Sequence, residues 1–454
     1  MKLGNYLLRI YEKIQLTPYF LRITRLVGQS FNVTLKQSFA MWRLGFFFHD
    51  MAFGLLTVFI PLYVVTFQNT AILGGPLLAL GVMTSIAIFC SIPASFLWGY
   101  LCDKTRHYKV FILLSFASIA VILFLMTLPF AQNLIAFVLL YIAMQMLHVA
   151  HESPKNVLVT EHYSRKDWER SFGFYEGLTE IGFIIGLAVG MVLFASTLTF
   201  STLSTYSLYF CSALSVVALV LAIALISDPI MVFERRLVGL ERKLDFTHRG
   251  LKGSSRLMDG LRWDGSLKEE SFRGFAFAIV LFALATSLFF TPLPIYLKIV
   301  FDGQEQYVYL AYILNSVGAT VGYFLIRGKA RSIDIRKQMP RFILIRSFLV
   351  FSLVGVIAFA IVPTFLTCIL LVCLGFAYAM YYIMMLSLSM EIIPEGKAGL
   401  FDGMVSLGAA SGAFLGPFLV TRFSYLPSVF SYVPIFIITA VLFLVAFFTL
   451  KVLR

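Results

Sequence analysis

Apolar residues dominate the chain in twelve long runs that short polar stretches separate. Each run has roughly the 20 residues that a helix needs to cross about 30 Å of hydrocarbon. A membrane β-strand would instead be about ten residues of alternating pattern, and lipid accommodates only helices or closed barrels. The pattern predicts an all-α membrane protein with twelve transmembrane helices. They cover residues 41–67, 75–100, 109–130, 134–160, 171–194, 204–227, 273–299, 306–327, 341–362, 364–390, 398–421 and 428–450.

One long polar stretch, residues 228–272, interrupts these runs after the sixth. It predicts an N-terminal six-helix bundle over 41–227, a cytoplasmic linker over 228–272 and a C-terminal six-helix bundle over 273–454. Internal repeats of this kind are common in transporters. Residues 1–40 interleave basic and apolar side chains, which indicates an amphipathic cytoplasmic segment lying on the inner leaflet. A disordered tail is the alternative.

Charge supports the membrane assignment and suggests an orientation. The chain is 60% hydrophobic and 13% charged, with a net charge of +13. If both termini are cytoplasmic, 34 of the 36 Lys and Arg residues fall in the termini or in cytoplasmic connections, and only Lys298 and Arg422 lie outside. This is the distribution that the positive-inside rule expects. We therefore predict a multi-pass protein of the cell membrane. Charges spread over loops form no single basic face, which argues against nucleic acid as a partner.

Glycines repeat at matching positions in the fifth and eleventh predicted helices. The fifth contains Gly173, Gly182, Gly186 and Gly190, and the eleventh contains Gly399, Gly408, Gly412 and Gly416 at the same intervals. A second register, starting at Gly403, also includes Gly412 and Gly416. Small residues four apart let helices approach closely in lipid. Ordinary packing is thus an alternative to a functional role.

A charged patch, GYLCDKTRHYK at residues 99–109, follows the second predicted helix. Gly99, Asp103, Lys104, Arg106 and Lys109 resemble the cytoplasmic loop signature of the major facilitator superfamily. The resemblance implies two pseudo-symmetric six-helix bundles that rock about a central site. It also implies that this loop is a cytoplasmic gate, in which Asp103 accepts bonds from Arg106 or from the N-terminal end of the eleventh helix. A merely solvated turn is the alternative.

The glycines of the fifth helix extend this resemblance. Their spacing looks like a signature of proton-coupled drug and metabolite exporters, although Leu187 stands where that signature has proline. The resemblance therefore slightly favours export.

Ionisable residues inside the predicted helices are candidate functional groups, because hydrocarbon is an expensive environment for charge. At about 1.5 Å per residue they share one depth zone. Carboxyls in dry surroundings favour their neutral form and imidazoles titrate near neutrality, so this zone predicts proton coupling. Static interhelical pairs and a water-lined inner mouth are the alternatives. The residues are His49, Asp50, His148, His151, Glu152, Glu176 and Glu180.

A metal site and an enzyme active site were both weighed against these residues. His49, Asp50, His148, His151 and Glu152 include enough nitrogen and oxygen ligands for zinc. The chain has no HExxH spacing and no arrangement typical of nucleophilic catalysis. We therefore expect no metal, no cofactor and no enzymatic activity.

The second half offers different side chains for binding a solute. Asn315, Tyr378, Tyr381 and Tyr382 suit a bulky, partly apolar ligand, although core packing is the alternative for each. The sequence predicts a monomeric secondary transporter of a small organic solute, coupled to protons, with efflux slightly favoured. Proton-linked uptake of a sugar, organic acid or other metabolite is the rival prediction. A non-transporting sensor or lipid scramblase is the alternative from another class.

Overall fold

The computed structural model describes residues 41–105, 107–162, 168–196, 199–226, 272–329, 335–359, 363–392 and 398–452. In these ranges twelve spans are long and apolar enough to cross a membrane, and none of the described residues forms a strand. The predicted fold class is confirmed. The segment predicted over residues 1–40 lies outside the described ranges. So does the predicted linker 228–272, except for residue 272 itself.

The helices begin and end within a few residues of the predicted runs. The first half contains α3 (Arg43–Val64), α4 (Pro76–Thr105), α5 (Tyr108–Leu125), α6 (Leu134–His148), α7 (Glu152–His162), α8 (Trp168–Phe194) and α9 (Phe200–Leu225). The second half contains α11 (Phe272–Phe290), α12 (Leu293–Val300), α13 (Glu305–Lys329), α14 (Ile335–Phe359), α15 (Pro363–Ile392), α16 (Ala398–Arg422) and α17 (Val433–Val452). Short 3-10 helices lie at η1 (Gln68–Leu73), η2 (Pro129–Gln132), η3 (Val149–His151) and η6 (Phe430–Tyr432).

Two of the predicted helices are interrupted. The fourth divides into α6 and α7 around η3, and the seventh divides into α11 and α12 just before Leu293. Pro154 and Pro292 follow the two breaks closely, and proline removes a helical donor and crowds the preceding turn. The first break lies beside the ionisable side chains of α6 and α7.

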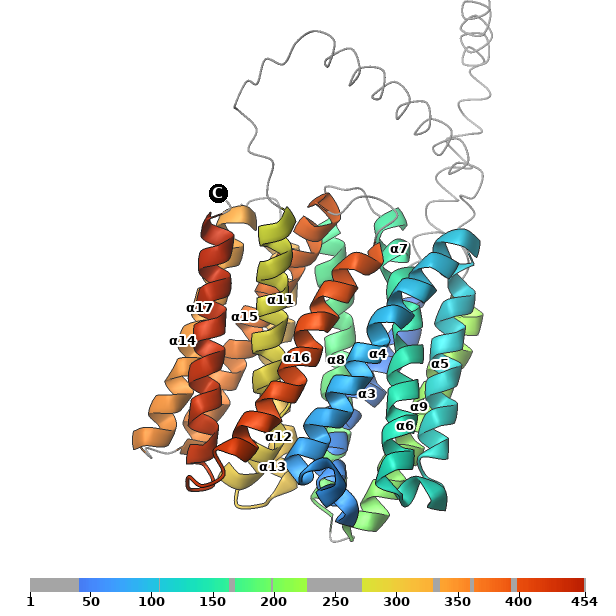
Figure 1. Ribbon diagram of the computed structural model, residues 1–454. Helices are drawn as coiled ribbons and strands as arrows, with labels where there is room; N and C mark the ends of the chain where they lie inside the picture. The colour runs from blue at the N-terminus through green and yellow to red at the C-terminus, as the bar shows by residue number, and fades with distance from the viewer. Residues whose placement is uncertain are drawn as a thin grey trace, which may run out of the picture.

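The halves stand side by side, with blue to green helices on one side of Figure 1 and yellow to red helices on the other. Two helix pairs join them, α4 with α16 and α8 with α13. We call the end where α9 stops and α11 starts the linker end, which is at the top of Figure 1, and the opposite end the far end.

Glycines hold equivalent helix pairs together in the two halves. A Cβ added at Gly186 of α8 would meet the backbone oxygen of Met51 in α3, and one added at Gly412 of α16 would meet that of Leu284 in α11. Gly182 contacts α3 as well, and Gly408 and Gly416 contact α11. Gly403 instead faces Phe96 of α4. Gly182 and Gly186 thus correspond to Gly408 and Gly412 in the register from Gly399, and to Gly412 and Gly416 in the register from Gly403.

Contacts between the halves occur at both ends of the molecule. Gly177 of α8 faces Phe324 of α13 toward the linker end, and Gly190 faces Tyr309 toward the far end. The α4–α16 pair likewise meets at Gly403 near the linker end and at Gly81, which faces Pro417, near the far end. Along these two helix pairs the structure is closed at both ends.

Candidate functional site

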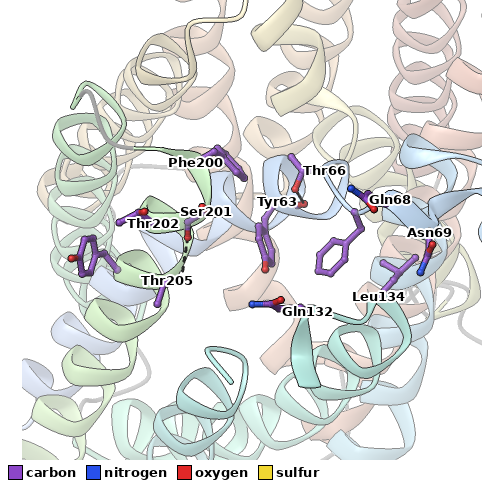
Figure 2. Close-up of a pocket in the computed structure, with 12 residues that line it drawn as sticks. Tyr63, Thr66, Gln68, Asn69, Gln132, Leu134, Phe200, Ser201, Thr202 and Thr205 are labelled. Carbon is purple, nitrogen blue, oxygen red and sulfur yellow. Dashed lines mark hydrogen bonds between the residues drawn. The ribbon is translucent and has the colours of Figure 1, made fainter. Parts of the chain in front are cut away.

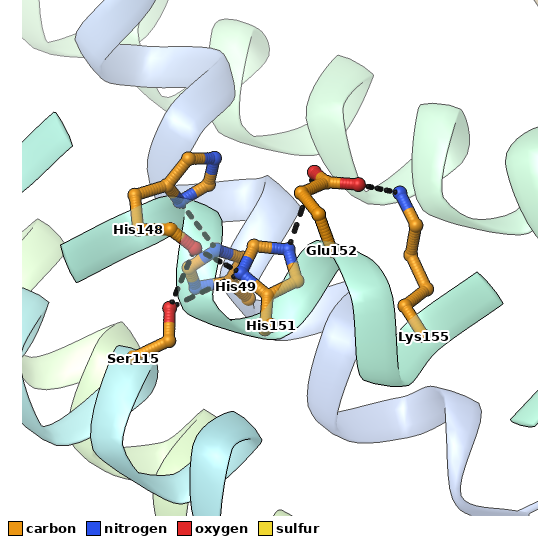
Figure 3. A network of polar contacts seen from close by, with 6 residues as sticks. All are labelled: His49, Ser115, His148, His151, Glu152 and Lys155. Carbon is orange, nitrogen blue, oxygen red and sulfur yellow. Dashed lines mark hydrogen bonds and ion pairs between the residues drawn. The ribbon is translucent and has the colours of Figure 1, made fainter. Parts of the chain in front are cut away.

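Three predicted histidines form one buried group beside the break in the fourth helix (Figure 3). His49 Nε2 of α3 lies 3.3 Å from His148 Nδ1 of α6. His151 Nδ1 lies 2.7 Å from the backbone oxygen of His148 and 3.1 Å from Ser115 Oγ. Because a carbonyl oxygen only accepts hydrogen bonds, His151 Nδ1 carries a proton and donates it. The other ring nitrogen of His151 is then the one available for proton exchange.

That second nitrogen faces a carboxyl. His151 Nε2 lies 3.5 Å from Glu152 Oε1, and Glu152 Oε2 lies 2.5 Å from Lys155 Nζ (Figure 3). A protonated imidazole would form an ion pair with this carboxylate, to which Lys155 is already paired. These contacts form two parts, His49 with His148 and His151 with Glu152 and Lys155, which meet at the backbone oxygen of His148.

Lys155 is also surrounded by carboxyls from other helices. It lies within electrostatic range of Asp50 in α3, Glu176 in α8 and Asp402 in α16. Glu180, one turn beyond Glu176, contacts Ser316 of α13 in the other half. We call the five carboxyls the acid cluster: Asp50, Glu152, Glu176, Glu180 and Asp402. The structure thus brings together all four carboxyls that the sequence analysis had selected and adds Asp402.

Three basic residues predicted in cytoplasmic connections lie instead inside the membrane-length spans. Arg43, Lys155 and Arg346 were counted with the cytoplasmic connections, but they are only 3%, 8% and 0% exposed and lie inside the membrane-length spans. Lys155 falls within the predicted run 134–160, and Arg346 falls within 341–362. Scanning those runs for cations as well as for acids and histidines would have found both.

The residues predicted to bind solute occupy two environments. Tyr378 and Tyr382 of α15 are partly exposed, and their rings stack with centroids 5.6 Å apart. Tyr381 is fully buried against Phe282 of α11, with centroids 3.7 Å apart. Asn315 has a buried side-chain oxygen without a hydrogen-bond partner among the described residues. Tyr381 therefore belongs to the interior of the second half, whereas Tyr378 and Tyr382 remain candidates for contact with solute.

The predicted gate is described only in part. Arg106 and the side chain of Asp103 lie outside the described residues. Gly99 faces Ser153 of α7, the exposed Lys104 lies beside the ring of Tyr100, and Lys109 Nζ donates to the backbone oxygen of Ile223, at the end of α9, across 2.7 Å. The role of this loop as a gate stays a prediction.

The histidines also have the right composition for a metal site. One nitrogen from each of His49, His148 and His151 lies within 4.8 Å of the others, so modest ring movements could place them around a transition metal ion. His49 Nε2 contacts His148 Nδ1, whereas His49 Nδ1 is buried without a hydrogen-bond partner among the described residues. We keep the expectation that no metal takes part.

A separate cavity of about 790 Å³ lies at the far end of the first half (Figure 2). Its wall combines Tyr63 of α3 with side chains from η1, η2 and α9, and none of its lining residues is charged. Tyr63 is thirteen positions after Asp50 in the same helix, about 20 Å along its axis. The sequence analysis selected no residue of this cavity, which is distant from the acid cluster.

Comparison with known proteins places the chain among transporters. The profile of the Major Facilitator Superfamily matches residues 43–401. No curated protein matches the chain by sequence. Among solved structures, a mutant of the nucleoside transporter NupG is 16% identical with a TM-score of 0.64, covering 92% of this chain and 99% of that one.

Two sugar transporters of E. coli have similar structures. The xylose transporter XylE, in a partially occluded inward open conformation, is 14% identical with a TM-score of 0.63 and covers 91% of this chain and 97% of its own. A mutant of the fucose:proton symporter FucP is 15% identical with a TM-score of 0.58 and covers 92% and 98%. At these identities the likeness concerns the fold.

Proposed function

The chain belongs to the major facilitator superfamily and is a transporter of small solutes rather than an enzyme, and from this premise we propose that it couples movement of one organic solute to movement of protons. The halves would alternate between openings at the linker end and at the far end. The acid cluster, with Lys155 and the three histidines, would bind and release the protons. Solute would bind between this region and the tyrosines of α15.

The observation that carries this proposal is the imbalance of charge around Lys155. Five half-buried carboxyls, those of Asp50, Glu152, Glu176, Glu180 and Asp402, lie in one region with the buried Lys155 among them. Like charges in a medium of low dielectric cannot all be ionised together. In the proposed cycle some of these carboxyls would hold protons, and a change in their surroundings would change how many.

Movement of the halves provides such a change. Asp402 belongs to the second half, while Glu152 and Lys155, which lie within its electrostatic range, belong to the first. Glu180 likewise contacts Ser316 across the boundary between the halves. When the halves separate at either end, these carboxyls lose their neighbours and gain water. Proton binding and alternating access are thereby linked through the same side chains.

Two directions of transport, export and proton-linked uptake, are candidates. The glycines that favour export in the sequence are explained here by packing, since Gly182 and Gly186 meet α3 and Gly190 meets Tyr309. That packing serves either direction. Likeness in fold to a fucose:proton symporter favours proton-linked uptake as the second candidate. Efflux stays the prediction from sequence, and vesicles of known orientation decide between the two.

The test is proton-driven flux in proteoliposomes with a pH-sensitive dye inside. A proton gradient is imposed across the membrane, and candidate solutes are then added, one chemical class at a time. We expect solute-dependent proton movement in the wild type and in Glu305→Gln, which removes a carboxyl paired with Lys298 at the far end across 2.6 Å. Asp50→Asn and Glu180→Gln should remove the coupling while the proteins stay folded. Normal coupling in both variants would refute the assignment, and proton-independent lipid movement would identify a scramblase.

A further inference from the structure

One basic residue of the second half has no use in the proposed proton chemistry. Arg346, in the middle of α14, is 0% exposed. Its Nε, Nη1 and Nη2 atoms all lack hydrogen-bond partners among the described residues. A buried guanidinium that makes no hydrogen bonds is costly, because desolvation of its N–H groups and charge is uncompensated. Such a group is retained where a partner of opposite charge binds to it.

Aromatic rings hold the guanidinium in place. Its Cζ atom lies 5.1 Å from the ring centroid of Phe282, and 5.0 Å from those of Tyr378 and Phe443. These rings come from α11, α15 and α17. Cation–π attraction stabilises the charge in part, but ring faces leave the N–H groups without oxygen acceptors. The three rings thus fix the position of a cation whose donors stay available.

Among the described residues, the titratable groups that act on Arg346 are phenols rather than carboxyls. Tyr323, Tyr378 and Tyr381 lie within its electrostatic range. Tyr323 and Tyr378 are also within range of Glu176 and Glu180 in the first half. Tyr323 and Tyr378 are therefore within range of both Arg346 and the acid cluster.

We propose that Arg346 binds the negatively charged group of the transported solute, and that this solute is a small organic carboxylate with a single charge; the inference rests on the proposed transport function. A planar guanidinium matches a carboxylate with two parallel hydrogen bonds. One cation balances one negative charge, so a doubly charged group would leave a buried charge uncompensated. The surrounding rings suit an apolar or aromatic body attached to the carboxylate.

The route to this site passes Tyr378. Its ring covers the guanidinium, yet Tyr378 itself is only partly buried and stacks on the partly exposed Tyr382. The halves contact one another toward both ends in this structure, which encloses Arg346. Separation of the halves would free the exposed side of Tyr378, and rotation of its ring would open Arg346 to solute.

The first experiment compares matched ligands on the purified wild-type protein in detergent. Thermal unfolding is followed with benzoate and hexanoate, with the neutral benzamide and hexanamide, and with inorganic phosphate. The carboxylates should raise the Tm with saturation, and the amides should not. Equal shifts from acids and amides, or a shift from phosphate alone, would overturn the proposal. The same unfolding measurement is made in nanodiscs that contain anionic lipid. If that lipid raises the Tm and the carboxylates do not, the proposal is also overturned.

Variants then connect the effect to this residue. Arg346→Gln removes the charge, and Arg346→Lys keeps a buried cation but loses the planar pair of donors, so the benzoate affinity should fall about tenfold or more in each. Arg341→Gln is the matched control, because Arg341 is exposed on the same helix and contacts Gln338. Unchanged benzoate binding in Arg346→Lys or Arg346→Gln would overturn the proposal.

Failure of this inference and failure of the proposed function give different results. Binding in detergent needs no gradient, so carboxylate binding without proton-driven flux would refute proton coupling and keep Arg346 as the anion site. Proton-driven flux of neutral solutes alone would refute Arg346 as the anion site and keep the proton coupling.

Discussion

The two halves share a backbone arrangement and differ in chemistry. In each, a glycine-bearing helix packs closely on the first helix of its own half, α8 on α3 and α16 on α11. The first half contributes four carboxyls, three histidines and Lys155 to the centre of the molecule. The second contributes Asp402 and Arg346, the latter surrounded by aromatic rings.

This difference teaches how one repeated fold can serve two tasks. In the proposed cycle the backbone repeat would supply rigid pieces that move against each other, while side chains that differ between the repeats would supply the chemistry. Titratable groups are concentrated at the centre of one half, and a fixed cation that cannot lose its proton at ordinary pH lies in the other. We infer that the first half handles protons and the second handles the charge of the solute.

The largest expected effect separates these two tasks. Glu180→Gln should lower proton-driven flux about tenfold or more, because it removes a proton-binding carboxyl at the boundary between the halves, and should leave benzoate binding in detergent nearly unchanged. Arg346→Gln should lower both. Parallel flux and binding measurements on the two variants check this. Loss of binding in Glu180→Gln would show that the tasks are not divided.

Removal of each central cation should affect stability differently. Lys155→Met leaves Glu152 without its partner and should lower the free energy of unfolding by about 3 kcal/mol, and adding Glu152→Gln should recover part of this loss. Arg346→Met leaves no carboxylate behind in its described surroundings, so its loss should be smaller. Thermal unfolding in detergent ranks the three proteins. An equal loss for the two single variants would contradict the contrast in their environments.

The shared feature of the halves predicts matched effects of a smaller size. Gly186→Ala and Gly412→Ala should each lower stability by about 1–3 kcal/mol, because the new methyl group meets a backbone oxygen of the neighbouring helix. Gly355→Ala in α14 serves as control, since an added Cβ there meets nothing within 4 Å. Unfolding curves of the three variants measure this. A harmless substitution at either packed glycine would break the equivalence of the two helix pairs.

The smallest effect concerns the loop that follows α4. Lys109→Met removes a hydrogen bond to the last turn of α9 and should lower stability by about 1 kcal/mol. Lys104→Met is the comparison, because Lys104 is exposed and part of the same motif. A loss as large for Lys104 as for Lys109 would show that the motif acts through its overall charge and not through this contact.

Sequence was sufficient for the fold because crossing a bilayer demands long apolar helices, which are visible without knowledge of their neighbours. The carboxyls and histidines could be located because ionisable residues stand out within such apolar runs. Lys155 and Arg346 lie within the predicted runs 134–160 and 341–362, and they were missed because those runs were searched for acids and histidines but not for basic residues. Asp402 needed the packing of α16 against the first half, which is not encoded locally.

The most direct test of the divided tasks is proton uptake on carboxylate binding. Benzoate is added to the purified protein in weakly buffered detergent solution, and the protons taken up are counted with an indicator dye. We predict uptake with the wild type, binding with reduced uptake for the double variant Asp50→Asn/Glu180→Gln, and neither binding nor uptake for Arg346→Gln. Benzoate binding by the wild type without proton uptake, or uptake unchanged in the double variant, would contradict the account.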